Sequence, residues 1–379
     1  MTRSAMLPFF RPYVSDEEAK AVAETVLSGW LSMGPRVAQF EGELEKYVGA
    51  KHVVSVNSCT AALHLSLLAH GVGKGDEVIT TPYTFTSTVN VIENMGATPV
   101  FADVLDDSFN IDPDEIKKKI TGKTKAIIPV HFAGQACRME EIMGVANGIP
   151  VIEDAAHAIG TTYKGKKVGS RTDTITCFSF YAIKNITTGE GGAIATSDDK
   201  IAERVSRLRL HGMDRDAWQR YSAKNKWRYD VSEPGWKYNL TDMQAALGLV
   251  QLKKIEEVAA KRRKIAEFYN SKFESVKGFK IPEEVEKGHA WHLYPLRVQG
   301  VDRDTFIERM TQQNIGTGVH FIPVHLFSYY RKKYGFKEGD FPIAEKAFNE
   351  EVSLPLYAFL SENDLNDVVD AALKSLEGA

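Results

Sequence analysis

The stretch CFSFYAIKNITTGEGG, residues 177–192, joins the end of a short apolar, aromatic-rich strand to a lysine and a glycine cluster. A lysine that loses hydration at a strand end has a lowered pKa, and its amine becomes a better nucleophile. A lysine that simply reaches into water where a strand ends is the commoner arrangement. The rest of the chain therefore decides whether Lys184 is a reactive residue or a surface residue.

Apolar runs of similar length recur on both sides of this stretch. Helical patterns such as residues 60–71 separate them, and most runs have the continuous apolar character of buried strands. Alternating strands and helices predict an α/β fold whose mostly parallel, seven-stranded sheet is flanked by helices. The strands are expected at 51–58, 76–82, 98–104, 125–134, 149–156, 174–180 and 191–197. Ligands of such sheets bind outside the carboxyl ends of the strands.

The pattern changes after residue 240. Residues 241–276 carry apolar side chains at helical spacing without a proline, which predicts a long helix with at most one break. A smaller α+β unit is expected beyond it, with strands at 289–298 and 316–321 and helices at 302–314 and 362–378.

These patterns divide the chain into a large domain with an N-terminal arm, residues 1–250, and a small C-terminal domain, residues 251–379. Residues 213–234 are polar with scattered aromatic residues and no clear periodicity. We expect this segment to be either a long active-site loop or a mobile excursion.

Composition and charge narrow the range of partners. The 47 lysines and arginines nearly balance 50 aspartates and glutamates, and neither sign forms a long run, so nucleic acid and membrane surfaces are not favoured. The first thirty residues lack the apolar core of a signal peptide, and no stretch approaches the about 18 apolar residues of a membrane span. Cys59, Cys137 and Cys177 indicate neither a disulfide framework nor a metal site. We expect a cytoplasmic protein with a small-molecule ligand and no metal.

A strand-to-helix turn near residue 58 is the first candidate for ligand binding. Ser58, Cys59, Thr60 and Ala61 lie there, and the free N–H groups and dipole of a helix N-terminus bind phosphate. Helix capping alone also explains a serine or threonine at this position, and does so more often.

Further candidates follow other predicted strands. Asp154 ends a buried strand, so its carboxylate needs either a nearby arginine or lysine or a cationic ligand atom such as a protonated pyridine nitrogen. His157 shares a helical face with Asp154 if a helix begins there. Phe85 offers a ring for stacking, although core packing explains most phenylalanines. Ser179 and Tyr181 alternate onto one side of their strand.

Together these residues supply a phosphate cradle, a carboxylate for a pyridinium, a ring for stacking and a lysine for an aldehyde. These are the groups that pyridoxal 5'-phosphate requires. We therefore predict this cofactor.

Four motifs carry a resemblance to a known family. EDAAHA (153–158), FSFYAIKNITTGEGG (178–192), SGW with GP (28–35) and GWKYNLTDMQAALG (235–248) resemble the DegT/StrS-type sugar-nucleotide aminotransferases, which are fold type I pyridoxal-phosphate enzymes. The similarity runs nearly end to end. The sequences of these motifs are most similar to those of the members that aminate UDP-4-keto-L-arabinose.

The resemblance implies roles for individual residues. Lys184 bonds to the cofactor aldehyde, and Asp154 pairs with the pyridine nitrogen. The implied cofactor-binding residues are Thr60, Ala61, Phe85, Asp154, His157, Ser179, Lys184 and Lys237. Family members are typically dimers in which the GWKYN segment reaches the phosphate bound by the other subunit, and Lys237 stands where many relatives have asparagine. The candidates for substrate contact are Tyr181, where many relatives have histidine, together with His320 and His325, although a structural hydrogen bond explains an isolated histidine equally well.

The implied reaction is transfer of an amino group from L-glutamate, which leaves as 2-oxoglutarate, to a UDP-linked 4-keto sugar for cell-surface polysaccharide or lipid A. A homodimer with shared active sites is expected. Amination of a 3-keto sugar, and a regulatory protein that has kept the fold without turnover, remain as alternatives. A related class of sugar dehydratases has histidine in place of Lys184, and an NAD-binding protein lacks support because no G-x-G-x-x-G follows a strand.

Overall fold

The computed structural model describes residues 3–214, 229–285 and 287–377. Most of the segment predicted as a loop or excursion, residues 215–228, lies outside the described residues. Its described ends lie side by side, because Met213 and Val231 form an antiparallel bridge.

A seven-stranded sheet forms the centre of the molecule. Its strands are β1 (His52–Val56), β2 (Glu77–Thr80), β3 (Thr98–Phe101), β4 (Thr124–Ile128), β5 (Ile152–Ala155), β8 (Ile175–Ser179) and β9 (Gly192–Thr196). The hydrogen-bonded groups β1-β9-β8-β5 and β3-β2-β4 meet through parallel bridges at Ile127–Val151 and Val130–Asp154. Only β9 runs antiparallel to its neighbours. The prediction of a mostly parallel seven-stranded sheet is confirmed, and each strand lies within one residue of its expected range.

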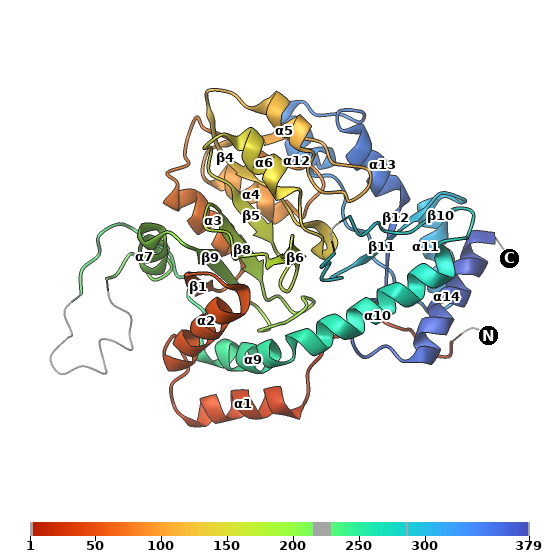
Figure 1. The fold of residues 1–379 in the computed structure, drawn as a ribbon, viewed down its shortest axis with the longest axis horizontal. Coiled ribbons are helices and arrows are strands. Elements are labelled where there is room, and N and C mark those ends of the chain that lie inside the picture. Colours follow the sequence, from red (N-terminus) through yellow and green to blue (C-terminus); the bar gives the residue numbers. More distant parts are fainter. Residues whose placement is uncertain (1–2, 215–228, 286, 378–379) are drawn as a thin grey trace.

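Helices cover both faces of this sheet (Figure 1). Those from the first part of the chain are α1 (Asp16–Leu27), α2 (Pro35–Val48), α3 (Cys59–Ala69), α4 (Thr86–Asn94), α5 (Pro113–Lys119), α6 (Met139–Ala146) and α7 (Asp199–Leu208). Alternate residues of each strand point to opposite faces of the sheet and pack against different helices. Val54 and Ile194 pack with α3, whereas Val53 and Ala195 pack with α2. A small hairpin of β6 (Thr162–Tyr163) and β7 (Lys166–Lys167) follows β5.

The long helix predicted after residue 240 is present and breaks once. α9 (Asp242–Lys253) begins at a capping box formed by Thr241 and Gln244, and α10 (Ile255–Phe273) follows after Lys254. Figure 1 shows α10 running from α9 beneath the sheet to the C-terminal elements. The division of the chain at residue 250 stays a prediction.

The C-terminal part contains a second, antiparallel sheet. Its strands are β10 (Phe279–Lys280), β11 (Tyr294–Val298) and β12 (Glu351–Leu354), and its helices are α11 (Arg303–Gln312), α12 (Ser328–Tyr334), α13 (Pro342–Glu350) and α14 (Glu362–Glu377). The expected strand at 289–298 is shorter than predicted. The expected strand at 316–321 is wrong, because that segment pairs only once, between Gly318 and Ser353. The third strand position belongs to β12, which the sequence did not predict.

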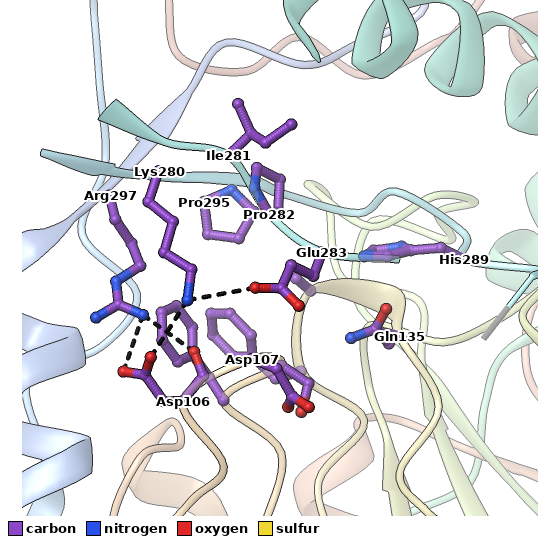
Figure 2. Close-up of a pocket in the computed structure, with 14 residues that line it drawn as sticks. Asp106, Asp107, Gln135, Lys280, Ile281, Pro282, Glu283, His289, Pro295 and Arg297 are labelled. Carbon is purple, nitrogen blue, oxygen red and sulfur yellow. Dashed lines mark hydrogen bonds and ion pairs between the residues drawn. The ribbon is translucent and has the colours of Figure 1, made fainter. Parts of the chain in front are cut away.

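Ion pairs join the second sheet to the loop after β3 (Figure 2). The Asp106 carboxylate lies 2.9 Å from the Arg297 guanidinium of β11 and 3.2 Å from the Lys280 ammonium of β10. Lys280 also lies 3.3 Å from Glu283. These contacts hold the C-terminal sheet against the carboxyl edge of the central sheet, where the candidate site lies.

Candidate functional site

A cavity of about 480 Å³ opens at the carboxyl ends of the central strands. Its walls come from the start of α3, the loops after β2, β4, β5 and β8, and the C-terminal segment around residue 320. The lining residues are Ser58, Cys59, Thr60, Thr84, Phe85, Ser87, Val130, Asp154, Ala156, His157, Ser179, Tyr181, Ile183, Lys184, Glu190, Gly191, His320 and Phe321. Candidates that are far apart in the sequence therefore meet in one space, as expected for an open α/β sheet.

Asp154 is buried at the end of β5. Its Oδ2 accepts a hydrogen bond from Thr88 Oγ1 at 2.8 Å, and its Oδ1 accepts one from the Ala156 N–H at 3.1 Å. Burial raises the pKa of Asp154, although both hydrogen bonds act in the opposite direction. Within the described residues no lysine or arginine forms an ion pair with it. The sequence left two possible partners for this carboxylate, a nearby arginine or lysine or a cationic atom of a ligand. The structure favours the ligand atom.

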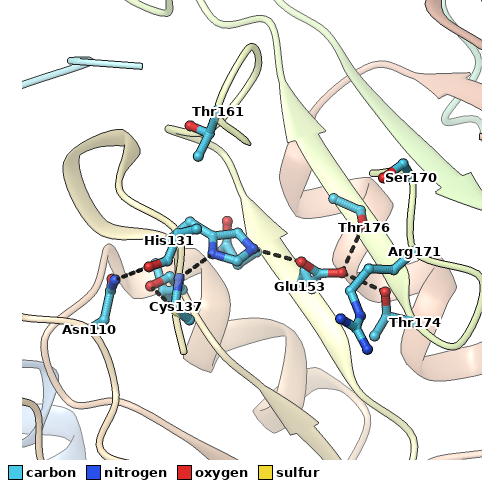
Figure 3. Close-up of polar contacts among 12 residues, drawn as sticks. Asn110, His131, Cys137, Glu153, Thr161, Ser170, Arg171, Thr174 and Thr176 are labelled. Atoms are coloured by element: carbon cyan, nitrogen blue, oxygen red, sulfur yellow. Dashed lines mark hydrogen bonds and ion pairs between the residues drawn. The ribbon is translucent and has the colours of Figure 1, made fainter. Parts of the chain in front are cut away.

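Glu153, the neighbour of Asp154 on β5, points toward His131, Thr174 and Thr176 (Figure 3). Its Oε2 lies 2.8 Å from His131 Nε2, and its Oε1 accepts hydrogen bonds from Thr174 at 2.5 Å and Thr176 at 3.1 Å. The Cys137 N–H donates to His131 Nδ1, so His131 carries its proton on Nε2 and donates to Glu153. Glu153 is therefore a structural residue that fixes β5 beneath the cavity.

Lys184 lies in the connection between β8 and β9, where its N–H donates to the Tyr181 carbonyl at 3.0 Å. Burial lowers the pKa of Lys184 to about 8, while the nearby Cys59 and Asp154 act to raise it. The next residue anchors the loop, because Asn185 Nδ2 donates to the Ala290 carbonyl at 2.9 Å. These features are those of a reactive lysine and not of a surface lysine.

His157 lies in the same cavity, but not for the predicted reason. No helix begins at Asp154, since β5 ends at Ala155 and His157 occupies a turn. The Ala133 N–H donates to His157 Nδ1 at 3.3 Å, so the imidazole carries its proton on Nε2. Burial and the nearby Lys184 lower its pKa, and the ring is neutral.

The start of α3 has two separable roles. Ser58 caps the helix, because its Oγ accepts the Ala61 N–H at 3.1 Å. Ala61 is buried and does not line the cavity. Thr60 and Ser179 do line it. A Cβ on Gly192 would lie 2.5 Å from the Ser58 carbonyl carbon, so this glycine allows β9 to approach the helix start closely.

Two aromatic rings are exposed at the cavity. Phe85 is 61% exposed and Tyr181 is 44% exposed, although both are large side chains. The Phe85 ring faces Phe321 with a centroid separation of 6.2 Å. Core packing therefore does not explain Phe85, and its ring is accessible to a planar ligand.

Two predicted site residues lie outside the cavity. Lys237 is exposed on an extended segment that pairs with Leu210. His325 is buried, its Nε2 lies 3.0 Å from Glu345 Oε1, and its ring packs on Phe341. The position of His325 is that of a structural histidine, and its role as a substrate residue stays a prediction. His320, in contrast, lines the cavity.

Sequence reasoning missed other residues of the site. Thr88 binds Asp154, Thr84 Oγ1 lies 3.0 Å from Thr88 Oγ1, and Phe321 closes the C-terminal side. The two threonines belong to TPYTFTST, directly after a predicted strand, and their position at a strand end was the available signal.

The residues present fit pyridoxal 5'-phosphate. A buried carboxylate that forms no ion pair among the described residues suits the pyridine nitrogen, and a half-buried lysine suits the aldehyde. The start of α3 with Thr60, together with Ser179 at the end of β8, suits the phosphate. The described residues contain no group of three or more histidine, cysteine, aspartate or glutamate side chains arranged to bind a metal ion. The described helices are too short or too polar to span a bilayer.

Comparison with known proteins agrees with this geometry. Residues 12–373 match the DegT/DnrJ/EryC1/StrS aminotransferase family. The chain is 50% identical over 385 residues to the spore coat polysaccharide biosynthesis protein SpsC of Bacillus subtilis, covering 100% of this chain and 99% of that protein. It is 51% identical over 381 residues to the uncharacterized protein MJ1066 of Methanocaldococcus jannaschii, covering 99% and 98%.

A solved structure gives the same result. The PLP form of the putative sugar aminotransferase Spr1654 from Streptococcus pneumoniae superposes with a TM-score of 0.91 at 32% identity, covering 98% of this chain and 99% of that chain. Its PMP form superposes equally well.

Proposed function

The chain belongs to the DegT/DnrJ/EryC1/StrS aminotransferase family, and we propose that it transfers the amino group of L-glutamate to a UDP-linked 4-keto sugar. It is a sugar aminotransferase that uses pyridoxal phosphate. The donor, the nucleotide and the position of the keto group are the proposed parts. The observation that carries the proposal is that Lys184 lies in one cavity with the buried Asp154, which forms no ion pair with a lysine or arginine of the described residues.

The side chains divide the chemistry between them. Bound pyridoxal phosphate supplies an electron sink for the reacting carbon. Asp154 holds the proton of the pyridine nitrogen, and Thr60 and Ser179 hold the phosphate. The Lys184 amine, with a pKa of about 8, would take a proton from the amino donor's α-carbon and deliver it to the C4' carbon of the cofactor. Because donor and acceptor use the same cavity in turn, the kinetics are ping-pong.

Several features support a sugar as acceptor. The cavity has room for a ring beside the cofactor, and its outer wall presents the exposed Phe85 and Tyr181 rings, which suit the apolar face of a sugar. Tyr181 and His320 offer hydrogen bonds to hydroxyl groups. SpsC carries spore coat polysaccharide biosynthesis in its name, which supports a sugar destined for a cell-surface polysaccharide.

A homodimer with shared active sites forms part of the proposal. Lys237 is exposed and lies outside the cavity of its own chain. We propose that it contacts the phosphate bound by the other subunit. Three buried free cysteines accord with a reducing cytoplasm.

The visible absorption spectrum of the purified protein tests the first half of the reaction. Wild type should be yellow and lose its colour with L-glutamate, whereas Lys184→Ala should not form the lysine-bound chromophore. The bleached enzyme is then offered 3-keto and 4-keto sugars linked to UDP or dTDP. Recovery of colour with a UDP-linked 4-keto sugar supports the proposal, and recovery only with a 3-keto sugar corrects it. A wild type that takes up no pyridoxal phosphate would favour a regulatory protein.

A further inference from the structure

A buried carboxyl group is connected to the cavity through two hydrogen bonds. Glu351 and Ser353 lie two residues apart on β12, both fully buried. Ser353 Oγ lies 2.5 Å from Glu351 Oε1, and His320 Nδ1 lies 2.9 Å from Ser353 Oγ. Glu351 Oε2 also accepts the His320 N–H at 2.7 Å. One carboxyl group therefore holds both the backbone and, through Ser353, the ring of a histidine that lines the cavity.

The ring of His320 has little freedom to turn. Phe9 stacks on it with a centroid separation of 5.5 Å, and a Cβ on Gly318 would lie 2.9 Å from its Cε1. Gly318 and Ser353 exchange both backbone hydrogen bonds, at 3.0 and 2.8 Å, which fixes the segment against β12. With Nδ1 bound to Ser353, Nε2 is the ring nitrogen left to bind a ligand.

The serine hydroxyl has one proton, so the direction of each hydrogen bond depends on Glu351. If Glu351 is ionised, Ser353 donates to Glu351 and His320 Nδ1–H donates to Ser353, which leaves Nε2 as a bare acceptor. If Glu351 is protonated, Glu351 donates to Ser353 and Ser353 donates to Nδ1, which puts the ring proton on Nε2. The two states differ by one proton, which ionisation releases to solvent.

We propose that Glu351 and Ser353 are positioning residues that set the tautomer of His320, so that protonated Glu351 makes Nε2–H a hydrogen-bond donor to an oxygen of the bound substrate. This inference deepens the proposed function and rests on it. The oxygen belongs either to the carboxylate of the amino donor or to the keto sugar. The donor carboxylate and the keto sugar both present electron-rich oxygens. Measuring the two half-reactions separately distinguishes between them.

The composition of the cavity supports a donor at this position. Among the described lining residues, the side chains that contain nitrogen are Lys184, His157 and His320, and none is an arginine. Lys184 is committed to proton transfer. A substrate oxygen near the C-terminal wall therefore depends on His320 for a nitrogen donor from this chain.

The surroundings favour protonated Glu351 at neutral pH. Burial raises the pKa of Glu351 to about 8, although Ser353, the His320 N–H and the Arg303 guanidinium lower it. The other groups near it are Tyr83, after β2, and Arg297, which is opposite on β11 and paired with Asp106 and Glu350. Burial and Lys184 lower the pKa of His320 to about 3, so the ring itself stays neutral.

Two variants separate the relay from simple packing. Glu351→Gln keeps a donor toward Ser353 and an acceptor for the His320 N–H, so it is a permanent mimic of the protonated state. Ser353→Ala keeps the backbone pairing with Gly318 and removes the relay. We expect Ser353→Ala to slow one half-reaction about tenfold at pH 7, the effect of one hydrogen bond. We expect the wild-type rate to decline above pH 8, and we expect Glu351→Gln to match the wild-type rate at pH 7 without this decline.

Single-turnover absorbance measurements with L-glutamate, and separately with the keto sugar, identify the oxygen. Slowing confined to the glutamate step assigns it to the donor carboxylate, and slowing confined to the sugar step assigns it to the sugar. Equal losses in Glu351→Gln and Ser353→Ala, or no loss in Ser353→Ala, would overturn the inference.

The tautomer can be read without any substrate. ¹⁵N NMR of the holoenzyme labelled at histidine, with the His320 signals assigned by their loss in His320→Gln, should show Nε2–H at pH 7 and Nδ1–H at pH 9.5. In Glu351→Gln the Nε2–H form should persist at both pH values. An Nδ1–H form at pH 7 would overturn the relay while leaving the proposed sugar substrate untouched, and a wrong sugar would leave this result unchanged.

Discussion

Thr88 Oγ1 donates a hydrogen bond to Asp154 Oδ2 over 2.8 Å, and it is the only side-chain oxygen of the described residues that does so. This bond lowers the pKa of a carboxyl group that burial raises. Thr88→Val removes the donor at nearly constant volume, so the pKa of Asp154 should rise and the pyridine nitrogen should lose protonation. We expect kcat to fall about tenfold, measured by steady-state kinetics with saturating pyridoxal phosphate.

Thr84→Val is the matched control for this change. Thr84 contacts Thr88 at 3.0 Å but does not contact Asp154, so its loss should have a much smaller effect on kcat. Equal losses in the two variants would mean that packing, and not the Asp154 contact, is responsible.

Lys184 should weaken the fold of the cofactor-free protein at neutral pH. Its pKa of about 8 lies below the usual 10.5, so the unfolded chain binds more protons than the folded chain between these values. Stability therefore rises with pH across this window, and the penalty is complete below pH 8. We expect Lys184→Met to raise the free energy of unfolding at pH 7 by up to about 3 kcal/mol.

Urea unfolding of the cofactor-free proteins at pH 7 and pH 10.5 tests this expectation. The advantage of Lys184→Met should largely fade at the higher pH, where Lys184 is deprotonated in the folded wild type and about half deprotonated in the unfolded chain. An advantage that is the same at both pH values would point to better packing by methionine.

Gly192→Ala should weaken cofactor binding through the start of α3. The new Cβ would lie 2.5 Å from the Ser58 carbonyl carbon and 2.6 Å from the Cys59 nitrogen, and both are backbone atoms that must move. We expect a loss of about 1–3 kcal/mol in stability and a higher dissociation constant for pyridoxal phosphate, measured by fluorescence titration.

Gly144→Ala is a control for this substitution. It lies within α6 with no heavy atom within 4 Å of the new Cβ, so it should stabilise the protein by up to about 1 kcal/mol. Unchanged cofactor affinity in Gly192→Ala would show that the phosphate site does not depend on this close approach.

His325→Gln should lower the Tm without changing KM for either substrate. The His325 ring packs on Phe341 and contacts Glu345, both outside the cavity. The comparison is His320→Gln, which alters a cavity residue and should raise KM or lower kcat. A KM effect confined to His325→Gln would support its predicted role as a substrate residue.

The central sheet could be predicted because its strands are continuous apolar runs, buried on both faces and separated by helices. The second sheet could not. The sequence GTGVHF at 316–321 alternates like a strand, but among the described residues it pairs at a single point, between Gly318 and Ser353. β12 reads EVSL, only four residues, and its buried glutamate and serine conceal its position in the interior.

The candidate site also contains residues that could be predicted from the sequence and residues that could not. Lys184 and Asp154 could be found because a charged residue at the end of a buried strand is conspicuous. Thr88 and Phe321 could not, because neither a threonine in the first turn of a helix nor a phenylalanine beside a histidine is unusual. His157 lies at the cavity because a turn, and not the predicted helix, follows β5. His325 lies outside the cavity and contacts Glu345.

The antiparallel direction of β9 has a consequence for the order of folding. Because β9 returns directly beside β8, with Ser179 opposite Gly192, Lys184 lies in a hairpin connection and not in a helical crossover. Hairpin contacts are local in sequence and form in microseconds, whereas the parallel pairs of the sheet must wait for long loops to close. We expect the segment that carries the reactive amine to be among the first parts of the sheet to take shape as the chain leaves the ribosome.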